Sequence, residues 1–254
     1  LLGEQAALGL DLTLWTIGTL IGLVTAVSVP VLLFLREGNA EDAAFGGWLM
    51  PVVPPMVSAS AGAAIVPHLP AGEARTDLLA ACAMLFGATI VPALLIMGQL
   101  WARLVRHGPG PAAMVPTLWI VLGPLGQSAT AAMGLGRAAG HVLPEGLADT
   151  ARLAGLVYAA PVMGTALLWM AIAASLTVRQ LRRGMPFALT WWSFTFPVGT
   201  CVTGASGLAE AAGTGALRAL AVAMYLGLVA AWGIVFVRTV HGALRSGRLL
   251  APPA

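Results

Sequence analysis

The sequence predicts an all-α polytopic membrane protein, and three observations support that prediction. Of the 254 residues, 59% are hydrophobic and 9% are charged, whereas soluble domains carry about 25% charge. All 13 basic and 10 acidic residues fall outside seven long apolar stretches. Each stretch has about the 20 residues that a helix needs to cross a bilayer. We expect seven transmembrane helices in a single domain over residues 1–254, at about residues 12–35, 46–66, 78–102, 113–136, 153–178, 187–209 and 219–237.

The second, fourth and sixth stretches differ in composition from the rest. Each mixes proline, glycine and small hydroxyl residues, whereas the odd-numbered stretches are plainer and richer in leucine and alanine. A proline inside a helix removes one hydrogen-bond donor and clashes with the carbonyl four residues earlier. We therefore expect free carbonyls at Pro51, Ile120 and Ser193, ahead of Pro55, Pro124 and Pro197.

Such free carbonyls indicate where water could enter the helix bundle. At membrane depth they are tolerated only inside the protein or beside a water-filled cavity. The three mixed stretches are therefore predicted to be inner helices that line a cavity, and the plainer ones to face lipid. The alternative is that proline and glycine are simply frequent in membrane helices.

The basic residues are all arginines near the ends of the stretches, and their distribution predicts the orientation. One side of the membrane would hold nine of them and the other side four, and the side with the excess should be cytoplasmic. The C-terminus belongs to the larger group, so we expect a multi-pass protein of the cell membrane with a cytoplasmic C-terminus. The larger group is Arg36, Arg103, Arg106, Arg179, Arg182, Arg183, Arg238, Arg245 and Arg248, and the smaller is Arg75, Arg137, Arg152 and Arg218.

Patterns of catalytic, metal-binding or nucleotide-binding residues do not occur in this sequence. The four histidines lie in loops or at the ends of stretches, without an HExxH pattern, and the two cysteines, Cys82 and Cys201, lie in different stretches. A phosphate-binding GxxxxGK[ST] pattern is also missing. We expect no enzyme activity, metal or cofactor, and no nucleic-acid partner, because the arginines are placed as membrane orientation requires.

The apolar stretches contain no Asp, Glu, Arg, Lys or His, although proton relays and coupled pumps usually place such groups there. This favours passive movement of an anion through a neutral lining whose hydroxyl and amide groups replace part of its hydration. A single hydroxyl in a helix commonly bonds back to its own backbone, so the candidates are predicted as a set. The predicted pore-lining residues are Pro55, Ser58, Ser60, Thr117, Pro124, Gln127, Ser128, Thr195, Pro197 and Thr200.

Three strings in the mixed stretches are similar to a known family. GWLMPVVPPMVSASAGA from Gly47, PTLWIVLGPLGQSA from Pro116 and WWSFTFPVGT from Trp191 closely resemble the tellurite-resistance/dicarboxylate transporter family. That family includes TehA-type bacterial channels, yeast malate and sulfite transporters and plant slow-type anion channels. The resemblance extends over about residues 12–248.

The resemblance implies ten helices in five hairpins, with the odd-numbered helices around a central pore. The seven stretches correspond to the fourth to tenth helices, so the mixed stretches become inner helices. The chain has no initiator methionine, and seven crossings with an internal C-terminus would start outside; both are expected of a longer protein that has lost three helices. We therefore expect an open crescent of helices, and the family also implies a possible homo-trimer.

In TehA-like channels an aromatic ring of the ninth helix blocks the pore, and the matching residue is Phe196. The resemblance thus implies transport of small anions or C4-dicarboxylates through an uncharged pore gated by Phe196. One alternative is a proton-coupled exporter of dicarboxylate, sulfite or tellurite, which would need ionisable groups elsewhere. A membrane-embedded enzyme or a structural subunit is the alternative of another class. Phe196 packed in an ordinary helix interface is the alternative to a gate.

Overall fold

Helices make up all the regular structure in the described residues, 3–36 and 42–246, of the computed structural model. Arg248, one of the nine arginines counted for the orientation, lies outside these residues. The helices alternate in length. The long ones are α1 (Glu4–Phe34), α3 (Glu73–His107), α5 (Glu145–Arg182) and α7 (Gly215–His241), and the short ones are α2 (Pro54–Ile65), α4 (Leu122–Ala139) and α6 (Phe196–Ala212).

The three short helices are the continuations of tighter 3₁₀ segments in the same stretches. These segments are η1 (Gly46–Leu49), η3 (Ala112–Val121) and η4 (Leu189–Phe194), which precede α2, α4 and α6 respectively. Five helical segments in the described residues are long and apolar enough to span a membrane, and α2 and α6 are not among them. Each of the expected spans at residues 46–66 and 187–209 is divided into a short 3₁₀ segment and a longer α-helix: η1 has 4 residues and α2 has 12, and η4 has 6 residues and α6 has 17.

The prolines of the mixed stretches begin helices rather than kink them. Pro55 and Pro197 occupy the second position of α2 and α6, and Pro124 lies in the first turn of α4. First-turn residues have no carbonyl four residues earlier within the helix, so a missing N–H costs little there. The prolines therefore fix where each helix starts instead of bending it. The carbonyls of Pro51 and Ser193 accept no backbone hydrogen bond from the described residues, as expected.

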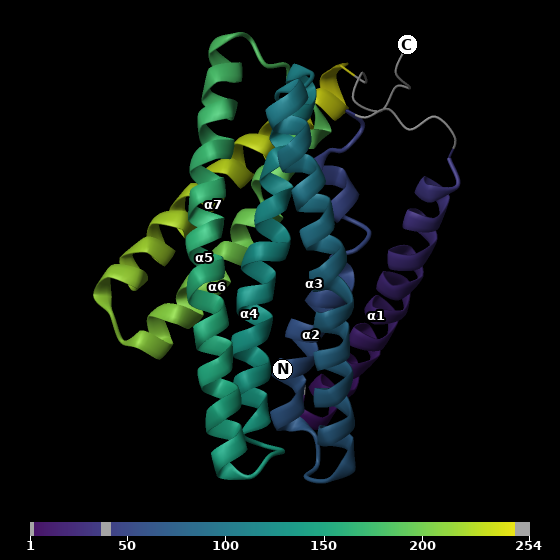
Figure 1. Ribbon diagram of the computed structural model, residues 1–254, viewed down its shortest axis with the longest axis vertical. Coiled ribbons are helices and arrows are strands. Elements are labelled where there is room, and N and C mark those ends of the chain that lie inside the picture. Colours follow the sequence, from purple (N-terminus) through teal and green to yellow (C-terminus); the bar gives the residue numbers. More distant parts are fainter. Residues whose placement is uncertain (1–2, 37–41, 247–254) are drawn as a thin grey trace.

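The helices form a row in which α4 is central. α4 packs on α2, α5 and α6, and Figure 1 shows α1 at one side of the molecule and the yellow-green α6–α7 hairpin at the other. In an apolar 18-residue stretch of the η3–α4 span 72% of the residues are buried, against 11–28% in such stretches of α1, α3, α5 and α7. The described helices thus follow the expected alternation of inner and outer positions, most clearly at α4.

Glycines let the inner helices approach closely. A Cβ on Gly126 of α4 would stand 2.5 Å from the backbone nitrogen of Cys201 in α6, and one on Gly155 of α5 would stand 2.6 Å from the carbonyl oxygen of Ala132 in α4. Small residues at such contacts are typical of membrane helix interfaces, where packing replaces the hydrophobic effect. This packing sets the positions of the α4 and α6 first turns, which carry the candidate site.

Candidate functional site

Two cavities lie on either side of the start of α6. Cavity A has a volume of about 750 Å³ and is lined by the first turns of α2, α4 and α6, by η1, η3 and η4, and by Gly18 of α1. Cavity B has a volume of about 720 Å³ and lies between α4, α6 and α7. The residues that line both cavities are Trp192, Thr195 and Phe196.

Phe196 is the first residue of α6 and is 54% exposed. The residue before it, Thr195, has φ −103° and ψ −86°, which interrupts the helical path between η4 and α6. The break turns the ring out of the helix stack, so that it forms part of the wall between cavities A and B.

The predicted pore-lining residues divide into three groups by position. Cavity A receives Ser58, Thr117, Pro124, Thr195 and Pro197. Cavity B receives Gln127, Thr195 and Thr200. The remaining three, Pro55, Ser60 and Ser128, line neither cavity, because their helices turn them toward other neighbours; Pro54, one residue from Pro55, lines cavity A instead.

Most of the predicted hydroxyl donors are already used by the backbone. The Thr117 hydroxyl donates to Met114 O at 2.7 Å, Thr195 to Trp192 O at 2.6 Å, and Ser128 to Leu125 O at 3.0 Å. Thr200 likewise donates to Pro197 O at 2.8 Å. The back-bonding anticipated for single hydroxyls is confirmed, and such hydroxyls present lone pairs rather than hydrogens to a solute.

Four other donors near Phe196 are unused in the part of the chain that the structure describes. The Ser58 hydroxyl in cavity A and the Gln127 amide in cavity B have no hydrogen-bond partner there, although both residues are more than 90% buried. The N–H groups of Phe196 and Val198 in the first turn of α6 also have no backbone acceptor, and no side chain caps this helix. The start of α6 is thus an uncapped helix N-terminus that opens on both cavities.

Known proteins are similar in sequence to this chain over most of its length. The sequence model of the voltage-dependent anion channel (SLAC1) family matches residues 2–240. The chain belongs to this family. A sulfite efflux pump, SSU1, of Arthroderma otae is 27% identical over 236 residues, 90% of this chain and 62% of the pump. A transporter of Methanocaldococcus jannaschii is 25% identical over 228 residues, 89% of this chain and 63% of the transporter.

This chain therefore spans a little under two thirds of the length of these relatives. Another SSU1 sulfite efflux pump, of Trichophyton rubrum, matches equally at 27% identity, with the same shares covered. No solved structure is detectably similar to the chain. The family is one of channels and transporters, as the sequence strings suggested.

In this anion-channel family member, η4 is held by contacts from two other elements, η3 and α7. The Thr190 hydroxyl donates to Ala113 O of the η3 segment at 2.6 Å. The Trp192 indole N–H donates to the Thr239 hydroxyl of α7 at 3.2 Å, and the Arg238 guanidinium lies 5.1 Å from the centroid of the Trp191 ring. We call Trp191, Trp192, Arg238 and Thr239 the α7 clamp; it fixes η4 directly before Phe196.

Sequence reasoning missed some residues of the site. Trp192 lines both cavities and lies four residues before Phe196, one helical turn away, a spacing that could have indicated it. Thr130 of α4 and Thr203 of α6 pair through their hydroxyls at 2.8 Å. Both lie three residues beyond predicted lining residues, Gln127 and Thr200, so helical periodicity could have found them.

Groups of three or more His, Cys, Asp or Glu side chains that could hold a metal do not occur in the described residues. The two cysteines are both buried and unpaired. The described residues that line the two cavities can contribute hydrogen bonds and apolar contacts to a solute.

Proposed function

We propose that this chain forms part of a passive transmembrane conduit for small anions or C4-dicarboxylates, with Phe196 as its gate. The observation that supports the proposal best is the uncapped start of α6, where unused N–H donors lie beside an exposed aromatic ring between two cavities. Family membership supports an anion as the solute.

The start of α6 can attract an anion without any ionised side chain. A helix N-terminus carries the equivalent of roughly half a positive charge, and its free N–H groups point toward the approaching anion. The Phe196 and Val198 N–H groups supply such donors, and Ser58 and Gln127 add two more, one in each cavity. A weak, distributed attraction of this kind allows the anion to leave again.

Phe196 suits a hydrophobic gate because of where its backbone lies. The break at Thr195 separates its ring from the regular α6 packing, so a rotamer change moves the ring without unwinding the helix. An apolar constriction blocks ions by excluding water, and removal of the ring should let water and ions through.

Sulfite is among the candidate solutes because two of the relatives described above are sulfite efflux pumps. A passive conduit and a proton-coupled exporter differ in their need for a titrating group. The seven apolar stretches of this chain contain no such group, which favours the passive mechanism. Transport of sulfite that continues unchanged without a pH gradient would support it, and strict dependence on the gradient would favour the exporter.

The gate is tested by Phe196→Ala in the full-length protein, reconstituted into liposomes. We expect anion flux to rise at least about tenfold, because loss of the ring removes a dewetted barrier of more than roughly 1.4 kcal/mol. Phe34→Ala is the matched control, since Phe34 is 79% exposed on α1 and lines neither cavity. Equal flux in wild type and Phe196→Ala would remove Phe196 from the gate.

A further inference from the structure

A cleft at the other end of α4 and α6 is lined by charged residues that the conduit does not use. It lies between α4, α5 and α6 and has a volume of about 520 Å³. Three of its residues, Arg137, Arg152 and Glu210, are exposed and form its rim, whereas Met133 is buried at its floor. We call it the arginine cleft, and its other lining residues are Leu153, Leu156, Gly207 and Ala211.

The arginine cleft lies at the depth where lipid headgroups meet the acyl region. Arg137 belongs to the last turn of α4, Glu210 lies two residues before the end of α6, and Arg152 lies about two turns into α5, directly before the apolar residues 153–178. α5 has 38 residues and is about 57 Å long, which exceeds the ~30 Å hydrocarbon core. The charged rim therefore lies outside the core and the apolar floor reaches into it.

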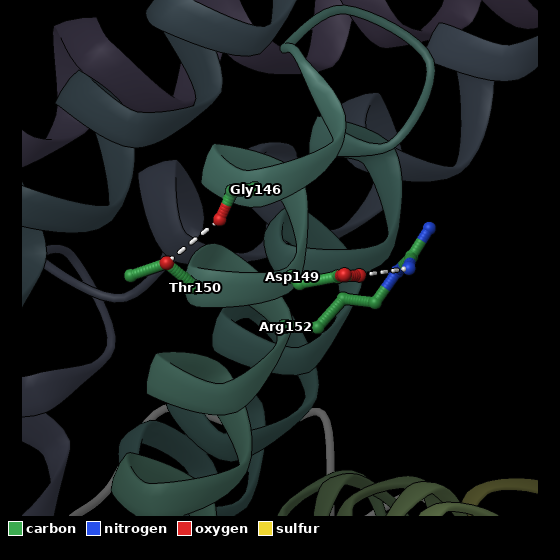
Figure 2. A network of polar contacts seen from close by, with 4 residues as sticks. All are labelled: Gly146, Asp149, Thr150 and Arg152. Atoms are coloured by element: carbon green, nitrogen blue, oxygen red, sulfur yellow. Dashed lines mark hydrogen bonds and ion pairs between the residues drawn. The ribbon is translucent and has the colours of Figure 1, made fainter.

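The charges on the rim are only partly neutralised by one another. Arg152 donates from Nη1 to Asp149 Oδ1 at 2.8 Å, and Figure 2 shows both side chains on the same side of α5, away from Thr150. Arg137 and Glu210 have no hydrogen-bond or ion-pair partner among the described residues, although both line the cleft. The rim thus offers the free guanidinium of Arg137 and the free carboxylate of Glu210. Together with the Asp149–Arg152 pair, these four side chains have a net charge of zero.

Gly207 keeps the cleft open between these two free groups. A Cβ at this position would stand 2.7 Å from Met133 Cε and 4.0 Å from Arg137 Nη1. A larger side chain there would push into the space between the arginine and the apolar floor. The end of the Met133 side chain could move aside for a methyl group, but a leucine at this position would fill the cleft.

We propose that the arginine cleft binds a phospholipid with an ethanolamine headgroup. Arg137, assisted by the free edge of Arg152, binds the phosphate, because guanidinium groups match phosphate oxygens with paired N–H donors. Glu210 accepts hydrogen bonds from the ammonium, which has N–H donors that a choline headgroup lacks. Met133, Leu153 and Leu156 contact the glycerol and upper acyl carbons. Basic pockets between transmembrane helices on the cytoplasmic side of membranes bind anionic headgroups; the charges that line this cleft sum to zero and match a zwitterionic lipid instead.

The experiment uses the full-length protein purified in detergent, to which defined lipids are added before native mass spectrometry and thermal unfolding. Phosphatidylethanolamine should be retained more than tenfold better than phosphatidylcholine or phosphatidylglycerol and should raise the unfolding midpoint. Arg137→Gln and Gly207→Leu should lose this retention, Arg137→Lys should keep part of it, and Glu210→Gln should remove the preference for ethanolamine. Arg75→Gln is the control, since Arg75 is an arginine in the first turn of α3, at the same end of the bundle, and does not line the cleft.

Several outcomes would overturn the proposal. Equal lipid retention by wild type and Arg137→Gln would place the lipid elsewhere, and the same stabilisation by inorganic phosphate alone would make the cleft a free-anion site. A change of oligomeric mass in Arg137→Gln without loss of lipid would assign the cleft to an interface between copies of the chain. If Arg137→Gln does not fold, Glu210→Gln decides, because its headgroup preference is measured within one folded variant.

Discussion

At the contact between α4 and α6, single residues show how closely the two helix backbones approach each other. Gly126 sits against the α6 backbone, and the Thr200 hydroxyl, which donates to Pro197 O at 2.8 Å, also lies 3.1 Å from Leu122 O of α4. The hydroxyl thus connects α6 to α4 while it bonds within its own helix. Two helices that touch backbone to backbone place Phe196 and Gln127 at fixed positions around the cavities.

The Gly126 contact gives a prediction on stability. Gly126→Ala would put a Cβ 2.5 Å from backbone atoms of Thr200 and Cys201, which cannot move as a flexible side chain can. We expect a loss of about 1–3 kcal/mol of unfolding free energy, the usual cost of overpacking, measured by unfolding in detergent. Gly164→Ala on α5 is the control, because nothing lies within 4 Å of its added Cβ; it should be neutral or slightly stabilising. Similar losses in both variants would contradict the prediction.

At the level of secondary structure, the broken inner stretches are the main feature. A 3₁₀ segment followed by a proline-initiated α-helix brings a helix start to the middle of each inner stretch. In η4 the segment is anchored by the α7 clamp, so the position of Phe196 depends on contacts made by the far end of α7. Movement of α7 would therefore be transmitted to the wall between the cavities.

The α7 clamp gives a prediction about gating. Thr239→Val keeps the side-chain shape but leaves the Trp192 indole N–H without its acceptor, a loss of about 1 kcal/mol. We expect basal anion flux in liposomes to rise, by less than in Phe196→Ala, and the double variant to conduct no more than Phe196→Ala alone. Thr165→Val serves as control, since the Thr165 hydroxyl bonds only within α5. Additive effects of the two substitutions would show that the clamp does not act through Phe196.

At the scale of the whole molecule, the helices alternate in direction and so divide their ends between two faces. α3 and α5 end on the face where α7 also ends, and α4 and α6 end on the opposite face (Figure 1). The first face carries most of the arginines, including Arg106, Arg182 and Arg238. Their excess supports the proposal that this face is cytoplasmic.

Labelling with a membrane-impermeant maleimide tests that orientation in intact cells. Cys82 and Cys201 are fully buried, so background labelling should be low. We expect Thr214→Cys, before α7, to be labelled from outside, and Arg183→Cys, after α5, to be labelled only once the membrane is permeabilised. The opposite pattern would reverse the proposed topology.

The sequence by itself determined the helical membrane class, the family and the division into inner and outer stretches. Apolar length, charge placement and motif strings are local properties, and each can be read without knowing which segments meet. The family resemblance also singled out Phe196, and the composition of the proline-rich stretches singled out Ser58 and Gln127 as candidate donors.

Only the tertiary structure decided where the inner helices begin and what their polar groups do. Hydropathy cannot separate a 3₁₀ turn from an α-turn, so the sequence does not show where the α-helical parts of residues 46–66 and 187–209 begin. The hydrogen-bond partners of Thr117, Thr195 and Thr200, and the free N–H groups of α6, depend on backbone geometry at each break. The arginine cleft likewise forms only where α4, α5 and α6 bring residues 137, 152 and 210 to the same depth. The packing of these three helices determines that arrangement.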